Sequence, residues 1–307
     1  MAYNGVTIVV DDKTIDKMHA FYSDQIVPTN DLYTIFMVKL EGVVIKAYRN
    51  KKLHNYKVYF TGDDALKEAQ IWDIDAKLIQ NEPKEQITWI YLEDQIGSDE
   101  VGVGDFFAPT IVVAAYVKKD QIEEIRELGV KDSKRLSDDK IRIIAPKLMN
   151  LVKYEKLIMS NHKLLEMLSK GSNKLGLESF MHNTCQMRLI NKYNLKCKVF
   201  VDEFLGEHGY RSYLANTETP NDITFKTKGE SYYPSIAVAS IIARYILLIY
   251  MDDLNDRYGV KFPLGAGENV DFFSVDFVKN NSLEDLQNIA KINFINYQNL
   301  FEKLSNE

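Results

Sequence analysis

The sequence of 307 residues predicts an α/β protein in which a small α+β unit precedes a larger domain of strands and helices. Three observations favour this fold class. The N-terminal part carries closely spaced strand patterns with one or two helical patterns. A polar stretch with Pro83 follows it and indicates a linker. From about Thr88 onward, apolar strands alternate with longer helical patterns, which is typical of a sheet flanked by helices.

The N-terminal unit is expected to form a small sheet with its helices on one face. Its elements in chain order are a helix over residues 13–27, strands over 33–42, 43–53 and 55–62, and a short helix over 63–72. The short helix opens with Asp63 and Asp64, and either residue suits the N-cap position.

The strands of this unit carry basic side chains with aromatic side chains among them. Because lysines neutralise phosphates without reading sequence, the strands could form a platform for a nucleic-acid backbone. The alternative is an ordinary solvated face over an aromatic core. The basic residues are Lys39, Lys46, Arg49, Lys51, Lys52 and Lys57, and the aromatic ones are Tyr33, Phe36, Tyr48, Tyr56 and Tyr59.

The larger domain mixes strands and helices along its whole length. Strands are expected over 87–92, 110–117, 154–160, 197–204 and 223–229, and helices over 120–129, 137–150, 174–194, 234–254 and 284–304, the last as one helix or a pair. The strand over 110–117 is nearly all apolar, so we expect both of its faces to be buried. Gly129 and Ser137 are expected to end and begin their helices.

Composition excludes several classes of protein. Cys185 and Cys197 lack the spacing of a thiolate zinc site, and two cysteines make no disulfide framework. The N-terminus has no signal-peptide pattern, and the apolar run over 106–117 is too short to span a bilayer. We therefore expect a cytoplasmic protein without a membrane segment. The net charge of −6 does not exclude nucleic acid, because local basic patches decide that contact.

Acidic side chains follow or end several predicted strands. Asp99 and Glu100 are adjacent, Asp202 and Glu203 end a second strand pattern, and Glu230 follows a third. Carboxylates from separate strands that meet at one sheet edge suit Mg²⁺, which takes oxygen ligands. Two such ions can hold the attacking and leaving oxygens of a phosphoryl displacement. The alternative for each acid is a solvated turn residue.

Two loops suit contact with a sugar–phosphate chain. Gly102 and Gly104 flank Val103 directly after the acid pair, and their small size allows another backbone to approach. No P-loop or dinucleotide-binding spacing is present, so a nucleotide cofactor is not indicated. The second loop brings together a hydroxyl and three cations that suit phosphate oxygens, although a simple helix-to-helix turn is equally compatible. Its residues are Lys131, Ser133, Lys134 and Arg135.

Several motifs together resemble the type 2 ribonucleases H, and ribonuclease HIII in particular. They are GSDEVGVGDFFAP, GVKDSKRLSDDKI, VDEF, TKGES and AVASIIARY, and their order and spacing match over essentially the whole chain. The resemblance implies an RNase H-like mixed sheet flanked by helices. It also implies a small N-terminal domain like the TATA-box-binding protein (TBP-like). The domains would be a substrate-binding domain over residues 1–80, a linker over 81–90 and a catalytic domain over 91–307.

The resemblance also implies an activity and its cofactors. We expect endonucleolytic cleavage of the RNA strand in RNA–DNA hybrids, with 5′-phosphate and 3′-hydroxyl ends, by a monomer that uses two Mg²⁺ or Mn²⁺ ions. Asp99 matches the carboxylate that bridges both ions, and Glu100 and Asp202 match the other core ligands. Glu230 is our choice for the fourth acid. Glu203 and Glu207 are its alternatives.

Substrate contacts are implied around this site and in the small domain. In relatives, the backbone of the glycine motif touches the 2′-hydroxyl groups that distinguish RNA from DNA. The expected substrate-binding residues are Ser98, Gly102, Val103, Gly104, Lys131, Ser133, Lys134, Lys228, Ser231, Lys46 and Lys57.

Two other functions stay open from the sequence. One is cleavage at a single ribonucleotide embedded in DNA, as in ribonuclease HII, which depends on a tyrosine that Tyr232 or Tyr233 could supply. The other is hybrid binding without catalysis, which the full set of acids argues against. His182 lies on a helix among apolar residues and is interpreted as structural.

Overall fold

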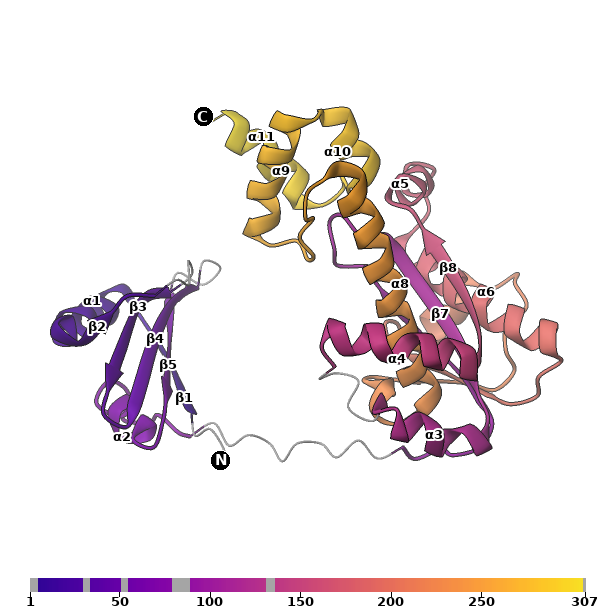
Figure 1. Cartoon of the computed structure of the whole chain (residues 1–307), viewed down its shortest axis with the longest axis horizontal. Helices are drawn as coiled ribbons and strands as arrows, with labels where there is room; N and C mark the ends of the chain where they lie inside the picture. The colour runs from indigo at the N-terminus through magenta and orange to yellow at the C-terminus, as the bar shows by residue number, and fades with distance from the viewer. Residues whose placement is uncertain (1–4, 30–33, 51–54, 79–88, 131–135, 306–307) are drawn as a thin grey trace. The chain divides into compact units, whose positions relative to one another are not determined.

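The computed structural model describes residues 5–29, 34–50, 55–78, 89–130 and 136–305. The chain divides into two compact units, residues 1–86 and 87–307, which are coloured indigo to purple and purple to yellow in Figure 1. The expected linker over 81–90 falls mostly outside the described residues. Each unit has its own buried hydrophobic cluster, so each is described by itself.

The N-terminal unit is a five-stranded antiparallel sheet in the order β1-β5-β4-β3-β2. Its elements are β1 (Gly5–Val10), α1 (Asp12–Phe21), β2 (Ile26–Val27), β3 (Thr34–Leu40), β4 (Val43–Asn50), β5 (Asn55–Thr61) and α2 (Ala65–Ala69). The three predicted strands and both helices are confirmed. The edge strands β1 and β2 were not predicted, and the first helix ends at Phe21 rather than continuing to Val27.

The larger unit is built on a mixed five-stranded sheet in the order β10-β9-β6-β7-β8. β10, β9 and β6 are mutually parallel, whereas β7 is antiparallel to both β6 and β8. The strands are β6 (Gln95–Val101), β7 (Thr110–Val117), β8 (Lys153–Met159), β9 (Lys198–Asp202) and β10 (Ile223–Lys226). The helices are α3 (Ile122–Glu127), α4 (Asp138–Leu151), α5 (Asn161–Ser169), α6 (Lys174–Tyr193), α7 (Glu207–Tyr213), α8 (Pro234–Tyr258), α9 (Glu268–Asn280), α10 (Leu283–Ile289) and α11 (Ile295–Ser305).

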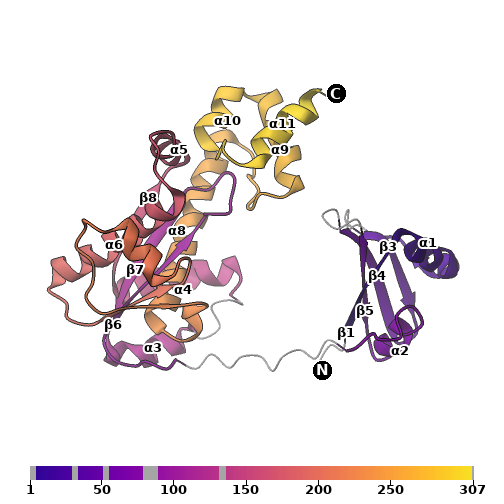
Figure 2. The ribbon, with the colours of Figure 1, turned by 180° about the vertical axis from the view of Figure 1, so that it is seen from behind.

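Helices cover both faces of this sheet. Ile111 and Val113 of β7 belong to one hydrophobic cluster with α8 and α4, whereas Val112 and Ala114 belong to another with α6 (Figures 1 and 2). Every residue of β7 is buried, which confirms the expectation of two covered faces. The predicted fold class, a mixed sheet flanked by helices and preceded by a small α+β unit, is therefore confirmed.

Helix α8 is the central helix of this unit. By length and composition it could cross a membrane, and it is longer than the apolar run over 106–117. However, 72% of its most hydropathic window is buried inside the protein. Such burial is typical of the core helix of a globular unit.

The strand predicted over 87–92 is wrong over its described part, because residues 89–92 form no strand. The strand begins instead at Gln95 and contains both Asp99 and Glu100. Trp89 contributes its ring to the core from outside any strand, which explains the misleading apolar pattern. β6 itself is rich in polar and small residues, and its pairing with β7 and β9 overrides their weak strand preference. Helices α5, α7 and α9 were also not predicted.

Candidate active site

The end of β6 carries two carboxylates that face opposite sides of the sheet. Gly97 packs so closely on α8 that an added Cβ would lie 2.3 Å from the backbone nitrogen of Ile236. Asp99 points to the same side, because side chains two apart on a strand share a face, and its carboxylate interacts with Ser240 of α8. Glu100 points to the other side, toward α6. The sheet thus separates two adjacent acids that would otherwise repel at closer range.

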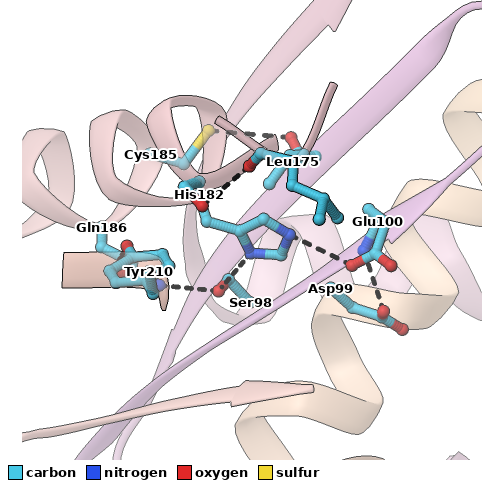
Figure 3. A network of polar contacts seen from close by, with 10 residues as sticks. Ser98, Asp99, Glu100, Leu175, His182, Cys185, Gln186 and Tyr210 are labelled. Carbon is cyan, nitrogen blue, oxygen red and sulfur yellow. Dashed lines mark hydrogen bonds and ion pairs between the residues drawn. The ribbon is translucent and has the colours of Figure 1, made fainter. Parts of the chain in front are cut away.

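Glu100 is oriented by a buried network from α6 (Figure 3). Nε2 of His182 lies 3.1 Å from Oε2 of Glu100, and Nδ1 lies 2.8 Å from Oγ of Ser98. The amide of Gln186 donates to the same hydroxyl at 2.8 Å. A neutral imidazole with its proton on Nε2 satisfies both contacts, because Nδ1 then accepts from Ser98 while Nε2 donates to Glu100. The histidine therefore fixes the carboxylate without touching solvent.

Asp202 ends β9 and lies next to Asp99 across the parallel pair. The printed register pairs Ser98 with Val201, so the next residues of the two strands are neighbours on the same face. The Asp202 Oδ1 atom accepts the backbone N–H of Gly229 at 2.7 Å. That hydrogen bond links the β9 end to the short turn that leads into α8.

Burial and the charges of the neighbouring acids disfavour the ionised form of Asp99. Burial, followed by the charges of Glu100 and Asp202, raises the pKa of Asp99 to about 8. A bound cation would oppose this shift, because an opposite charge favours the ionised carboxylate. Among the described residues, no three or more His, Cys, Asp or Glu side chains lie close enough together to form a complete metal site. Mg²⁺ does not need one, since it binds through a few carboxylates and keeps waters or substrate phosphates as its other ligands.

The structure separates the three candidates for a fourth acid. Glu230 is 6% exposed and adjoins Gly229, which contacts Asp202. Glu203 is exposed and accepts the hydroxyl of Thr227 at 2.7 Å. Glu207 is also exposed and pairs with Arg211 on its own helix. Glu230 is the candidate whose environment joins it to the other acids.

The glycine loop after β6 uses its two glycines differently. Gly102 has φ +85°, and a Cβ there would lie 2.0 Å from the carbonyl oxygen of Pro109. Gly104 is exposed, and nothing lies within 4 Å of a Cβ placed on it. The fold therefore requires glycine at the first position only, and the second leaves open space for a ligand.

The other expected substrate-binding residues of the larger unit differ in their exposure to solvent. Ser98 is fully buried, and its hydroxyl is hydrogen-bonded to His182 and Gln186, so its role in substrate binding stays a prediction that the side chain does not support. Ser231 is buried, whereas Lys228 is exposed in a left-handed turn with φ +57°. Lys131, Ser133 and Lys134 lie outside the described residues.

The open face of the N-terminal sheet pairs lysines with tyrosines across two strands. Lys46 is opposite Tyr59, and Tyr48 is opposite Lys57. The two tyrosine rings contact each other edge to face at 5.5 Å. We call these four residues the Lys–Tyr platform. They alternate with the buried residues of β4 and β5, so they point away from the helices.

Not every basic or aromatic residue predicted for this surface lies on it. Phe36 belongs to the core, and Tyr56 donates to Asp12 of α1 on the helix side of the sheet. Arg49 shares that side by strand alternation, whereas Lys39 is exposed on the open side. Tyr33, Lys51 and Lys52 lie outside the described residues.

Comparisons with known proteins decide the family. Residues 96–297 match the family described as Ribonuclease HII, and residues 5–85 match a Domain of unknown function (DUF3378). Ribonuclease HIII of Bacillus cereus is 34% identical over 98% of this chain and 99% of its own length. The chain belongs to the ribonuclease HIII family. It is therefore an enzyme of the ribonuclease H type, with nucleic acid as its substrate, which confirms the resemblance seen in the sequence.

Solved structures agree with this assignment. The crystal structure of Bst-RNase HIII in complex with Mn²⁺ is 31% identical and has a TM-score of 0.68, with 99% of this chain and 100% of that chain covered. RNase H3 of Aquifex aeolicus is 20% identical, with a TM-score of 0.54 over 93% of this chain and 99% of its own, and shares the fold.

Proposed function

We propose that this ribonuclease HIII family member cuts the RNA strand of RNA–DNA hybrids internally, with two Mg²⁺ or Mn²⁺ ions, and leaves 5′-phosphate and 3′-hydroxyl ends. The observation that carries the proposal is the placement of Asp99, Glu100 and Asp202 at the neighbouring ends of β6 and β9. The pKa of Asp99, which the charges of Glu100 and Asp202 raise, calls for cations beside these acids if they are to face a polyanion.

The site residues fit such ions by their chemistry. Asp99, Glu100, Asp202 and Glu230 offer the oxygen ligands that hard cations prefer. When bound, the ions would activate water and stabilise charge on the phosphoryl oxygens. His182 holds Glu100 in place, and the N–H of Gly229 holds Asp202 in place, without any bound ion. Such partners tune ligand orientation in metal sites generally.

We propose that the two units divide the work. The N-terminal unit, which we take to be a TBP-like substrate-binding domain, would supply affinity through the Lys–Tyr platform. Its lysines suit the phosphate groups of a nucleic-acid strand, and its tyrosines suit the sugars and bases next to those phosphates. The larger unit would supply the chemistry. We expect the enzyme to act as a monomer in the cytoplasm.

The glycine loop gives a matched pair of variants. Gly102→Ala is expected to destabilise the fold by more than about 1 kcal/mol, because a Cβ is disfavoured at positive φ and meets Pro109. Gly104→Ala is expected to leave the melting temperature unchanged while raising KM for hybrid about tenfold, because the methyl group would occupy space next to the ribose. Thermal melting and steady-state kinetics measure both. An unchanged KM in Gly104→Ala would show that the substrate does not bind next to Gly104.

The choice of substrate can be tested with two labelled duplexes. One contains an uninterrupted RNA strand, and the other contains a single ribonucleotide within DNA. We expect the first to be cut at least about tenfold faster. The reason is that Tyr233, 7% exposed and stacked on Phe200 at 3.8 Å, is a core residue, and Tyr232 lies under Lys226 at 4.7 Å. Equal or faster cutting of the second duplex would favour a ribonuclease HII-like activity.

A further inference from the structure

A fully buried lysine lies under the glycine loop. Lys291 belongs to the segment between α10 and α11, and none of its surface is exposed. Its ammonium group donates to the carbonyl oxygens of Gly102, Asp105 at 2.7 Å and Ala108 at 2.8 Å. Three N–H donors thus meet three acceptors from one loop. The match is complete for the ammonium ion.

This contact sets which way the loop peptides face. Because a trans peptide is planar, its C=O and N–H point in opposite directions. Holding the Gly102 carbonyl toward Lys291 therefore turns the N–H of Val103 away from it. In the same way, holding the Asp105 carbonyl turns the N–H of Phe106 away, and that group donates to Gly265 at 2.9 Å. The Gly102 carbonyl also accepts the N–H of Asp105 at 3.1 Å, so the lysine and this turn together select one of two opposite orientations for the peptide.

The C-terminal segments brace the same loop at further points. The backbone N–H of Lys291 donates to the carbonyl of Phe106 at 2.8 Å, and the side chain of Asp105 accepts the N–H of Gly265. Asn161 bridges the carbonyls of Phe107 at 3.1 Å and Ile289 at 2.7 Å. The loop is therefore shaped by residues from α5 onward rather than by its own sequence alone.

A buried cation in this place is costly for the fold. Burial lowers the pKa of Lys291 to about 8, and the nearby charge of Asp105 partly offsets the shift. An apolar side chain of similar volume would avoid the cost of burying a charge but would leave these three carbonyl oxygens without their donor. The ammonium group is therefore tied to one arrangement of the loop, the arrangement in which all three carbonyls point at it.

We propose that Lys291 is a positioning residue that sets the orientation of the Gly102–Pro109 loop, so that the backbone at Val103 and Gly104 can recognise ribose 2′-hydroxyl groups. The inference rests on the proposed hybrid cleavage and adds to it the residue that makes the loop specific for RNA. Lys291 itself does not touch the substrate. It acts through the three carbonyls that it binds.

The test compares two substrates on each of several variants of the full chain. One is an RNA–DNA hybrid, and the other carries a 2′-fluoro group at one ribose at a time around the cleaved phosphate. Fluorine keeps the size of the hydroxyl but is a poor hydrogen-bond partner. The measured quantity is the ratio of the two kcat/KM values. A loss of folded enzyme lowers both values equally and leaves this ratio unchanged.

For the unaltered chain, fluorine at the recognised ribose is expected to lower kcat/KM on the order of tenfold. In Lys291→Met the ratio is expected to fall to within about twofold of one, because a displaced loop no longer makes the lost contact. Lys291→Arg keeps the charge and the donors, so it protects the fold if the methionine variant does not accumulate. Its larger group is still expected to displace the loop and lower the ratio.

Lys303→Met is the matched control. Lys303 lies in the same C-terminal segment and contacts the ring of Phe272 at 3.9 Å, away from the loop. Its ratio is expected to equal that of the unaltered chain. If the unaltered chain does not cut hybrid, the proposed function fails. If it cuts hybrid but ignores every 2′-fluoro group, the proposed recognition of 2′-hydroxyl groups by the loop is wrong. If it discriminates and the Lys291 variants discriminate equally well, the positioning role is wrong.

Discussion

Asp99→Asn is expected to lower hybrid cleavage on the order of 10³-fold or more while hybrid binding stays within a few-fold of normal. Asparagine keeps the shape of the side chain but removes the charge that lies between Glu100 and Asp202. Binding depends on other surfaces, so it should persist. Cleavage of a labelled hybrid and a separate binding titration measure the two effects.

The metal-free melting temperature of Asp99→Asn serves as the control for folding. It should stay the same or rise, because the substitution removes a repelled, buried carboxylate. A companion set identifies the fourth acid: Glu230→Gln is expected to lose activity, whereas Glu203→Gln and Glu207→Gln are expected to keep it. Full activity in Asp99→Asn would contradict the proposed role of the acids.

Removal of residues 1–86 is expected to raise KM for hybrid about 10²-fold and to change kcat only a few-fold. Two binding surfaces on one chain reinforce each other, and loss of one removes that gain without altering the reacting groups. The remaining unit keeps its own hydrophobic core, so it should fold. Steady-state kinetics over a range of hybrid concentrations measures the effect.

A double variant of the full chain narrows this result to the Lys–Tyr platform. Lys46→Ala with Lys57→Ala should weaken hybrid binding and reduce the slope of log affinity against log salt by about two. Lys17→Ala is the control, since it lies exposed on α1 rather than on the open face of the sheet. An unchanged salt slope in the double variant would place the contact elsewhere.

Local patterns predicted most of the fold. The apolar sequence of β7 predicted a strand buried on both faces, which the structure confirms. Ser137 was predicted to begin a helix, and it caps α4 by accepting the N–H of Lys140. Sequence patterns failed at β6, whose glycine, serine and acids resemble a loop. Its strand state comes from pairing with β7 and β9, and these contacts cannot be read from the residues of β6 itself.

For the candidate site too, the sequence predicted the local motif but not the contacts between distant residues. The motif that holds Asp99 and Glu100 was visible in the sequence, but the roles of His182 and Lys291 were not. His182 lies 82 residues from Glu100 along the chain, and Lys291 lies 189 residues from Gly102. Both act through contacts that form only in the folded chain. A histidine and a lysine within otherwise apolar stretches were the only signals available.

The dependence of cleavage on divalent ions tests the central claim most directly. The enzyme is first stripped of metal, and initial rates on a labelled hybrid are then measured as Mg²⁺ or Mn²⁺ is added back. We predict no cleavage in the stripped state, saturable recovery with either ion, and products that end in 5′-phosphate and 3′-hydroxyl groups. Undiminished cleavage without metal, or products with 2′,3′-cyclic phosphates, would show that these carboxylates do not work by holding ions.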